Sequence, residues 1–209
     1  MKISYAIPVC NELREIQSLI NFLTQNKRPE DEIIILYDEN NGAKDVEEYL
    51  RSKSVNPTSF LWYPYKFEGH FANMKNHLTS LCSGDYIFQI DADELPNKHL
   101  IKMLPIVLEH NPSVDLYSVA RVNTVDGLTP EHIIKWGWDV NDKNWVNWPD
   151  FQTRIYRNSP DIKWKNKVHE VLEGFEYYTA LPAVEQLSLY HPKDIKRQEQ
   201  QNKYYETIT

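Results

Sequence analysis

Three acidic side chains directly follow an apolar run near the middle of the chain. The run Tyr86–Ile90 contains β-branched and aromatic residues, which is typical of a strand buried on both faces of a parallel sheet. Asp91, Asp93 and Glu94 come next. Open α/β sheets bind ligands beyond the carboxyl ends of their strands, so these carboxylates are expected to face a crevice. Side chains two residues apart at a strand end are expected to point the same way, so Asp91 and Asp93 could share Mg²⁺ or Mn²⁺, which could neutralise a diphosphate.

A solvated turn is the alternative, because an acidic chain of this length should contain roughly one Asp-x-Asp by chance. Two further polar clusters favour a site. Asn11 and Glu12 follow a strand predicted at residues 2–9, and Asp38 follows another at 32–37. In a parallel sheet these strand ends lie on one edge. The sequence has neither a Gly-x-Gly-x-x-Gly nor a Walker phosphate loop, so a metal or a Lys or Arg side chain must neutralise any phosphate.

Strand and helix patterns alternate along the first part of the chain, which predicts an α/β fold with a doubly wound, mostly parallel sheet. Asn11 is a plausible N-cap for the first helix. Expected strands lie at 2–9, 32–37, 59–63, 86–90 and 115–122, and expected helices at 13–26, 43–53, 70–81 and 97–109.

The pattern changes after residue 123. Residues 124–150 show no sustained periodicity and predict a long structured loop, followed by a strand at 151–156, a strand or hairpin arm within 162–172, and a helical tail from Pro192. Five of the six Trp fall between positions 136 and 164. Trp136, Trp138, Trp145 and Trp148 could stack on sugar rings in an acceptor loop or fill a second apolar layer, whereas Trp164 is expected in the core.

Composition narrows the class of protein. The 209 residues predict a single domain of ordinary apolar content, with no membrane span and no signal-peptide pattern. Cys10 and Cys82 lack metal-ligand spacing, and they are expected to be buried reduced thiols of a cytoplasmic protein. The net charge of −7 argues against general nucleic-acid binding.

The ordered series of motifs resembles glycosyltransferase family 2, whose members have the GT-A fold. This resemblance implies that the single domain has a nucleotide-sugar-binding half, residues 1–122, and a smaller acceptor-side half with the C-terminal helix, residues 123–209. The second half of the chain resembles the lipopolysaccharide-core branch of the family. The matching stretches are Ile7–Glu12, Asp38, Phe71–Asn76, Gly84–Ile87, Asp91–Glu94, Phe151–Asn158, Trp164, Val168–Glu170 and His191.

This resemblance implies a donor site. The donor is expected to be a UDP-sugar, with Asn11, Glu12 and Asp38 holding base and ribose and Lys75 approaching the phosphates or supporting the metal-site carboxylates. The complete set of expected donor-binding residues is Pro8, Val9, Asn11, Glu12, Asp38, Lys75, Asp91 and Ala92.

The resemblance also implies Mn²⁺ or Mg²⁺ bound by Asp93 and, directly or through water, by Asp91, with His191 as a further ligand. A surface histidine capping the final helix is the alternative for His191. An inverting transfer needs a carboxylate base near the acceptor hydroxyl, for which Glu170 and Asp150 are the candidates. For Glu170 the alternative is a structural ion pair with Arg154 or Arg157. His169 is open between a metal ligand, a phosphate contact and a core histidine.

The expected activity is therefore the metal-dependent, inverting transfer of a sugar from a nucleotide diphosphate to a hydroxyl of a glycan or another acceptor. A nucleotidyltransferase is one alternative, although the loop Val9–Glu12 lacks the glycines that such an enzyme normally carries. A non-catalytic module that binds sugars or nucleotides is the other.

Overall fold

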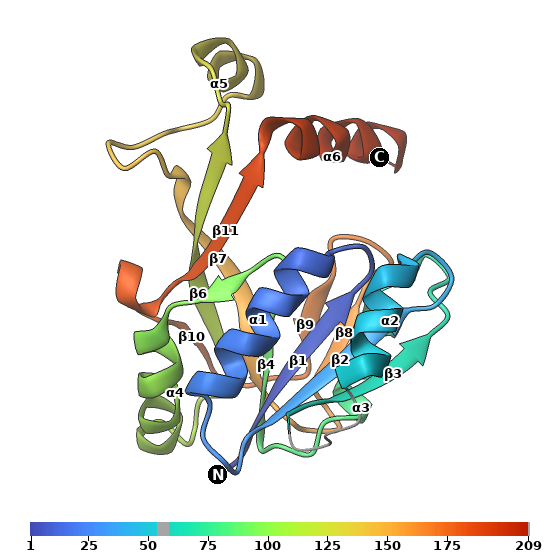
Figure 1. The fold of residues 1–209 in the computed structure, drawn as a ribbon. Helices are drawn as coiled ribbons and strands as arrows, with labels where there is room; N and C mark the ends of the chain where they lie inside the picture. Colours follow the sequence, from blue (N-terminus) through green and yellow to red (C-terminus); the bar gives the residue numbers. More distant parts are fainter. Residues whose placement is uncertain (54–58, 209) are drawn as a thin grey trace.

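The sheet is the centre of the molecule. The computed structural model describes residues 1–53 and 59–208, and in these residues nine strands form one sheet with the order β3-β2-β1-β4-β7-β6-β11-β5, with β10 pairing alongside β6 (Figure 1). The pairs β1–β2, β2–β3, β1–β4, β6–β10 and β6–β11 are parallel, whereas β4–β7, β6–β7 and β5–β11 are antiparallel. The predicted mixed α/β fold with a mostly parallel sheet is confirmed.

Most elements lie within one or two residues of the predicted ranges. The strands of the large sheet are β1 Ile3–Val9, β2 Glu32–Asp38, β3 Leu61–Tyr65, β4 Tyr86–Gln89, β5 Leu95–Pro96, β6 Leu116–Asp126, β7 Val146–Arg157, β10 Tyr178–Ala180 and β11 Leu189–Asp194. The helices are α1 Leu13–Asn26, α2 Lys44–Lys53, α3 Phe71–Ser80, α4 Lys98–His110, α5 Pro130–Trp136 and α6 Ile195–Ile208. The strands β8 Lys163–Lys165 and β9 Val171–Glu173 form an antiparallel hairpin, where one strand or one hairpin arm is predicted within 162–172.

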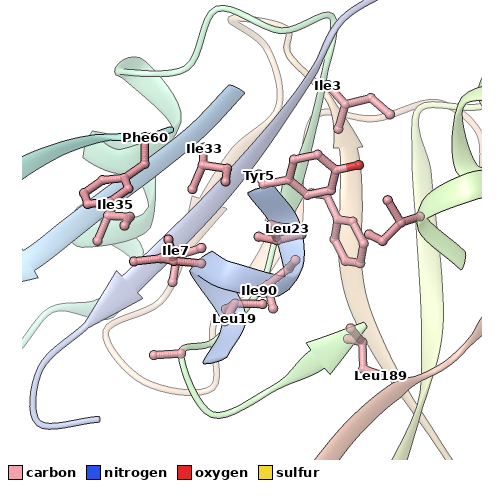
Figure 2. Close-up of a cluster of buried hydrophobic side chains, with 14 of the residues drawn as sticks. Ile3, Tyr5, Ile7, Leu19, Leu23, Ile33, Ile35, Phe60, Ile90 and Leu189 are labelled. Carbon is pink, nitrogen blue, oxygen red and sulfur yellow. The ribbon is translucent and has the colours of Figure 1, made fainter. Parts of the chain in front are cut away.

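Apolar side chains cover both faces of the sheet. Helices α1, α2 and α4 pack on one face, and Figure 2 shows Ile3, Tyr5 and Ile7 of β1 beside Leu19 and Leu23 of α1. Helix α3 and the β8–β9 hairpin pack on the other face. This double cover explains why the central strands read as nearly continuous apolar runs.

Gly84 allows the turn before β4 to approach β1. A Cβ at this position would lie 2.7 Å from both the backbone nitrogen and Oγ of Ser4. The Oγ of Ser4 also accepts a hydrogen bond of 2.8 Å from the Gly84 N–H. Any side chain would therefore push β4, and the acidic residues that follow it, away from β1.

Several predicted boundaries are wrong. The third strand lies at Leu61–Tyr65 rather than 59–63 because its residues follow the register set by β2. The predicted loop at 124–150 contains the end of β6, helix α5 and the start of β7. The helical tail begins at Ile195 rather than Pro192, because residues 192–194 pair with β6 in β11.

The ends of β6, β7 and β11 extend beyond the rest of the sheet towards α5 and α6 (Figure 1). The paired strands can extend in this way because their ladders satisfy the backbone polar groups without a covering layer of helices. Among residues 1–53 and 59–208, none of the helices has the length and apolar character required to cross a bilayer.

Candidate functional site

The loops after β1, β2 and β4 lie on one edge of the sheet, as the parallel pairing of these strands requires. Glu12 organises the first loop, because its Oε2 accepts hydrogen bonds of 2.9 Å from the backbone N–H groups of Cys10 and Asn11. The N-cap of α1 is Glu12, so the N-cap prediction for Asn11 is wrong. Asn11 is exposed at this edge, where its amide can reach a ligand.

Asp38 shapes the second loop. Its Oδ1 accepts hydrogen bonds from the backbone of Asn40 at 3.0 Å and of Asn41 at 3.2 Å, and its Oδ2 accepts one from the Asn41 side chain at 2.9 Å. The Cys10 thiol lies 3.9 Å from the same Oδ2. The carboxylate is therefore buried and held by its own loop, which places it at the predicted donor edge.

Three further residues predicted to bind the donor lie at or beneath these loops. Pro8 is half-buried at the end of β1, while Val9 and Ala92 are buried beneath the loops. Cys10 and Cys82 are free and half-buried. The prediction of free thiols is therefore confirmed, whereas the prediction that both thiols are buried is wrong.

Arg154 of β7 forms ion pairs with two residues of the acidic segment that follows β4. Its guanidinium pairs with Asp91 through a very short contact and with Glu94 Oε1 at 2.6 Å. Glu94 and Arg154 are both buried. Burial opposes ionisation of Asp91, but the charges of Arg154 and Lys75 outweigh it and lower the pKa of this carboxyl.

Asp93 faces the other way and meets His191 of β11. The distance from His191 Nε2 to Asp93 Oδ2 is 3.2 Å, and Arg197 Nη2 of α6 approaches the same oxygen at 3.2 Å. The Arg197 guanidinium also reaches Glu12 at 3.5 Å and Glu15 at 3.1 Å. Burial of Asp93 opposes ionisation, but its contact with His191 and the positive charges of Arg197 and Lys193 outweigh burial and hold the carboxyl pKa well below its usual value.

The structure therefore brings Asp93 and His191 together, while Asp91 pairs with Arg154 instead. Within residues 1–53 and 59–208, His, Cys, Asp and Glu side chains form no metal-ligand group of three or more. A carboxylate oxygen and an imidazole nitrogen at this edge fit Mn²⁺ or Mg²⁺ as a two-ligand protein site, which oxygen atoms of a diphosphate and water would complete. His191 does not cap the final helix, because its ring contacts Asp93 and Asn123.

Lys75 and Glu170 form an ion pair on the α3 side of the sheet. Lys75 Nζ lies 2.5 Å from Glu170 Oε1 and 4.4 Å from the centre of the Trp164 ring. Asn76 fixes the β8–β9 hairpin that carries Glu170, since it exchanges two hydrogen bonds of 2.9 Å with the Trp164 backbone. The predicted ion pair of Glu170 exists, but its partner is Lys75 rather than Arg154 or Arg157, because α3 packs directly on this hairpin. His169 is exposed, so it is not a core histidine.

Asp150 accepts four hydrogen bonds. Its Oδ2 takes two from Arg121, at 2.7 and 2.9 Å, and one from Asn123 at 2.8 Å, while its Oδ1 takes one of 2.7 Å from Gln152. Burial raises the pKa of this carboxyl, but the Arg121 charge and the donated hydrogen bonds outweigh it and lower the pKa. Arg121 Nη1 continues to Glu94 Oε1 at 3.1 Å.

These contacts form one continuous polar chain that we call the carboxylate relay. It starts at Asp91, crosses three strands and returns to Asp93. Its members are Asp91, Arg154, Glu94, Arg121, Asp150, Asn123, His191 and Asp93. Asp91 and Asp93 thus lie at the two opposite ends of a single network.

A cavity of about 320 Å³ opens beside the relay, and its walls include Asp150, His191 and Trp138. Trp138 and Trp136 are half-buried, with ring centres 4.6 Å apart. Trp145 and Trp148 are half-buried as well, and they pair with each other at 4.8 Å. A polar cavity with one indole in its wall suits a sugar ring. Trp164 is buried beneath α3, as predicted.

Five members of the site have no functional role predicted from the sequence. Arg121 and Asn123 lie within a regular strand, and Arg197 lies in a polar tail. Glu94 was expected to face the crevice, but it is buried between Arg154 and Arg121. Arg154 was noted only as a matching residue and as a partner for Glu170. The alternation of Arg121 and Asn123 along β6 is the one signal that could have indicated a shared polar face.

Known families and structures resemble the chain over most of its length. The model described as "Glycosyl transferase family 2" matches residues 4–175. No curated protein sequence matches the chain.

The solved structures of Staphylococcus aureus TarS 1–349 share the fold. The complex with UDP has 17% sequence identity and a TM-score of 0.64 and covers 92% of this chain and 60% of that chain. The complex with UDP-GlcNAc has 18% identity and a TM-score of 0.63 over 92% and 59%. The mannosyltransferase PcManGT from Pyrobaculum calidifontis, solved with GDP-Man and Mn²⁺, has 16% identity and a TM-score of 0.47 over 57% and 35%.

The chain therefore spans about 60% of the length of the TarS 1–349 structure, and at this identity the similarity concerns the fold. The family model covers well over half of the sequence. The chain belongs to glycosyl transferase family 2 and has the GT-A fold.

Proposed function

We propose that this protein transfers a sugar from a nucleotide diphosphate donor to a hydroxyl acceptor, with Mn²⁺ or Mg²⁺ bound by Asp93 and His191. The observation that supports the proposal most is the meeting of these two side chains, 3.2 Å apart, on the sheet edge that also carries Glu12 and Asp38. Family membership and the UDP and UDP-GlcNAc complexes of TarS support a UDP-sugar as the donor.

The donor-edge residues have separate tasks in this proposal. Asn11 and Asp38 bind the base and ribose, and Glu12 keeps the first loop in the required shape through its two backbone contacts. Lys75 lies where its charge already lowers the pKa of Asp91, so it can approach a phosphate without leaving the site. The metal supplies Lewis-acid stabilisation of the charge that develops on the leaving diphosphate.

Glu170 is the proposed general base for an inverting transfer. Its carboxylate forms an ion pair with Lys75, and a base must exchange that partner for the acceptor hydroxyl. Asp150 is the second candidate, but the four hydrogen bonds that it accepts and the charge of Arg121 stabilise its ionised form and make it a weaker base. The cavity lined by Trp138 is the proposed acceptor site, and because Glu170 is not among its lining residues, the acceptor hydroxyl must extend from this cavity towards the β8–β9 hairpin to reach that base.

Release of UDP from UDP-GlcNAc tests the proposal. We expect UDP release that depends on Mn²⁺, stops in EDTA, and is lost in Asp93→Asn but kept in Asp161→Asn, whose exposed carboxylate serves as a matched control. A non-catalytic module would release no UDP. A nucleotidyltransferase would instead release pyrophosphate from UTP and a sugar phosphate, and that product would contradict the assignment.

A further inference from the structure

Asn123 connects Asp150 to His191. Asn123 and His191 are directly paired on the parallel strands β6 and β11, which places their side chains next to each other on one face of the sheet. The Asn123 Nδ2 donates to Asp150 Oδ2 at 2.8 Å, and Asn123 Oδ1 lies 2.8 Å from His191 Nδ1.

The carboxylate of Asp150 determines which way the Asn123 amide points. An ionised carboxylate can only accept hydrogen bonds, so the amide nitrogen of Asn123 must face it and the amide oxygen must face His191. The opposite orientation would set two oxygen atoms against each other at 2.8 Å. Asp150 is itself fixed by Arg121 and Gln152 and therefore cannot turn to accommodate a flipped amide.

The orientation of Asn123 in turn determines the tautomer of His191. Because Asn123 Oδ1 can only accept, His191 Nδ1 must carry a proton and donate it. In the neutral ring this leaves the lone pair on Nε2, which points at Asp93 Oδ2 from 3.2 Å. A divalent cation ligated by both atoms would relieve the repulsion between these two acceptors, and it would have to displace Arg197, whose Nη2 lies 3.2 Å from the same oxygen.

We propose that Asn123, oriented by Asp150, is a positioning residue that fixes His191 in the Nδ1–H tautomer and so presents its Nε2 lone pair to the divalent ion shared with Asp93. This rests on the metal site of the proposed function. Asp150 then acts through Asn123 rather than as the base. Metal-bound histidines commonly need such a partner on their second nitrogen, and its loss typically weakens metal binding by about 10- to 100-fold.

Mn²⁺ binding in the presence of UDP tests the proposal, measured as free Mn²⁺ by electron paramagnetic resonance. Asn123→Leu keeps the approximate volume but removes both hydrogen bonds, and we expect it to weaken binding at least about 10-fold. Asn21→Leu on the exposed face of α1 is the matched control and should bind as the wild type does. The double variant Asn123→Asp with Asp150→Asn restores both hydrogen bonds: the new amide at position 150 donates to the new carboxylate at position 123, which still accepts from His191 Nδ1. It should therefore recover part of the affinity.

The imidazole nitrogen NMR shifts of His191, assigned with His191→Gln, give a second readout that needs no Mn²⁺. We expect a proton on Nδ1 in the wild type and a mixture of tautomers in Asn123→Leu. Wild-type Mn²⁺ affinity in a folded Asn123→Leu variant, or an unprotonated Nδ1 in the wild type, would overturn the proposal. If the wild type bound no Mn²⁺, the metal of the proposed function would fall, and the tautomer alone would decide whether Asn123 positions His191.

Discussion

Glu94 is the buried carboxylate on which the carboxylate relay depends most. It is 2% exposed and accepts hydrogen bonds from Arg154 at 2.6 Å and from Arg121 at 3.1 Å. Glu94→Gln removes the charge with little change of shape. Breaking a buried ion pair costs about 3–5 kcal/mol, because the partner charge stays buried. Each arginine keeps one carboxylate, Asp91 or Asp150, so we expect a loss near the lower limit, about 3 kcal/mol of unfolding free energy.

Urea unfolding of the metal-free protein measures this loss. For a chain of this size, 3 kcal/mol corresponds to a decrease in Tm of roughly 6–12 °C. Glu47→Gln, which breaks the exposed i,i+4 pair with Arg51, is the matched control and should cost no more than about 0.5 kcal/mol. A loss below about 1 kcal/mol for Glu94→Gln would refute the reasoning, because it would mean that the two arginines are satisfied without this carboxylate.

Three further predictions concern the site itself. Glu170→Gln should keep its affinity for UDP-GlcNAc while kcat falls by about 10²- to 10⁴-fold, as expected for loss of a general base; full residual turnover would place the base elsewhere. Arg197→Gln removes a positive charge 3.2 Å from Asp93 Oδ2, so calorimetry should show tighter Mn²⁺ binding, and an unchanged Kd would mean that Arg197 does not compete with the ion. The pKa values of Asp91 and Asp93 are depressed in the folded protein. The stability that these carboxylates contribute is therefore complete above their unfolded pKa of about 4 and is lost as the pH falls from there through their folded pKa values. Urea unfolding that shows no such loss between about pH 6 and pH 3 would contradict these assignments.

Much of the fold could be predicted because the central strands are buried on both faces. Apolar runs of this kind leave few alternatives, and the run before Asp91 does form β4. The region 124–150 was harder to predict, because the ends of β6 and β7 pair away from the core and carry polar residues on both faces. Helix α5 has no buried residue, so no apolar periodicity indicates it.

The candidate site could be predicted only in part. Asp91, Asp93 and His191 stand at strand ends or in strand-like surroundings, where residue type and position together indicate chemistry. The partners of these residues depend on which strands are neighbours. Arg154 reaches Asp91 because β7 inserts antiparallel next to β4, and Arg197 reaches Asp93 because α6 turns back over the sheet edge. Pairing between strands far apart in sequence leaves no local signal.

The central claim is that a divalent ion on Asp93 and His191 binds the diphosphate of the donor. Isothermal titration of UDP-GlcNAc into the wild-type protein and into Asp93→Ala, each with Mn²⁺ and with EDTA, tests it most directly. We predict saturable binding by the wild-type protein with Mn²⁺ and the loss of that binding in EDTA and in the variant. Equal donor affinity in all four titrations would contradict the claim.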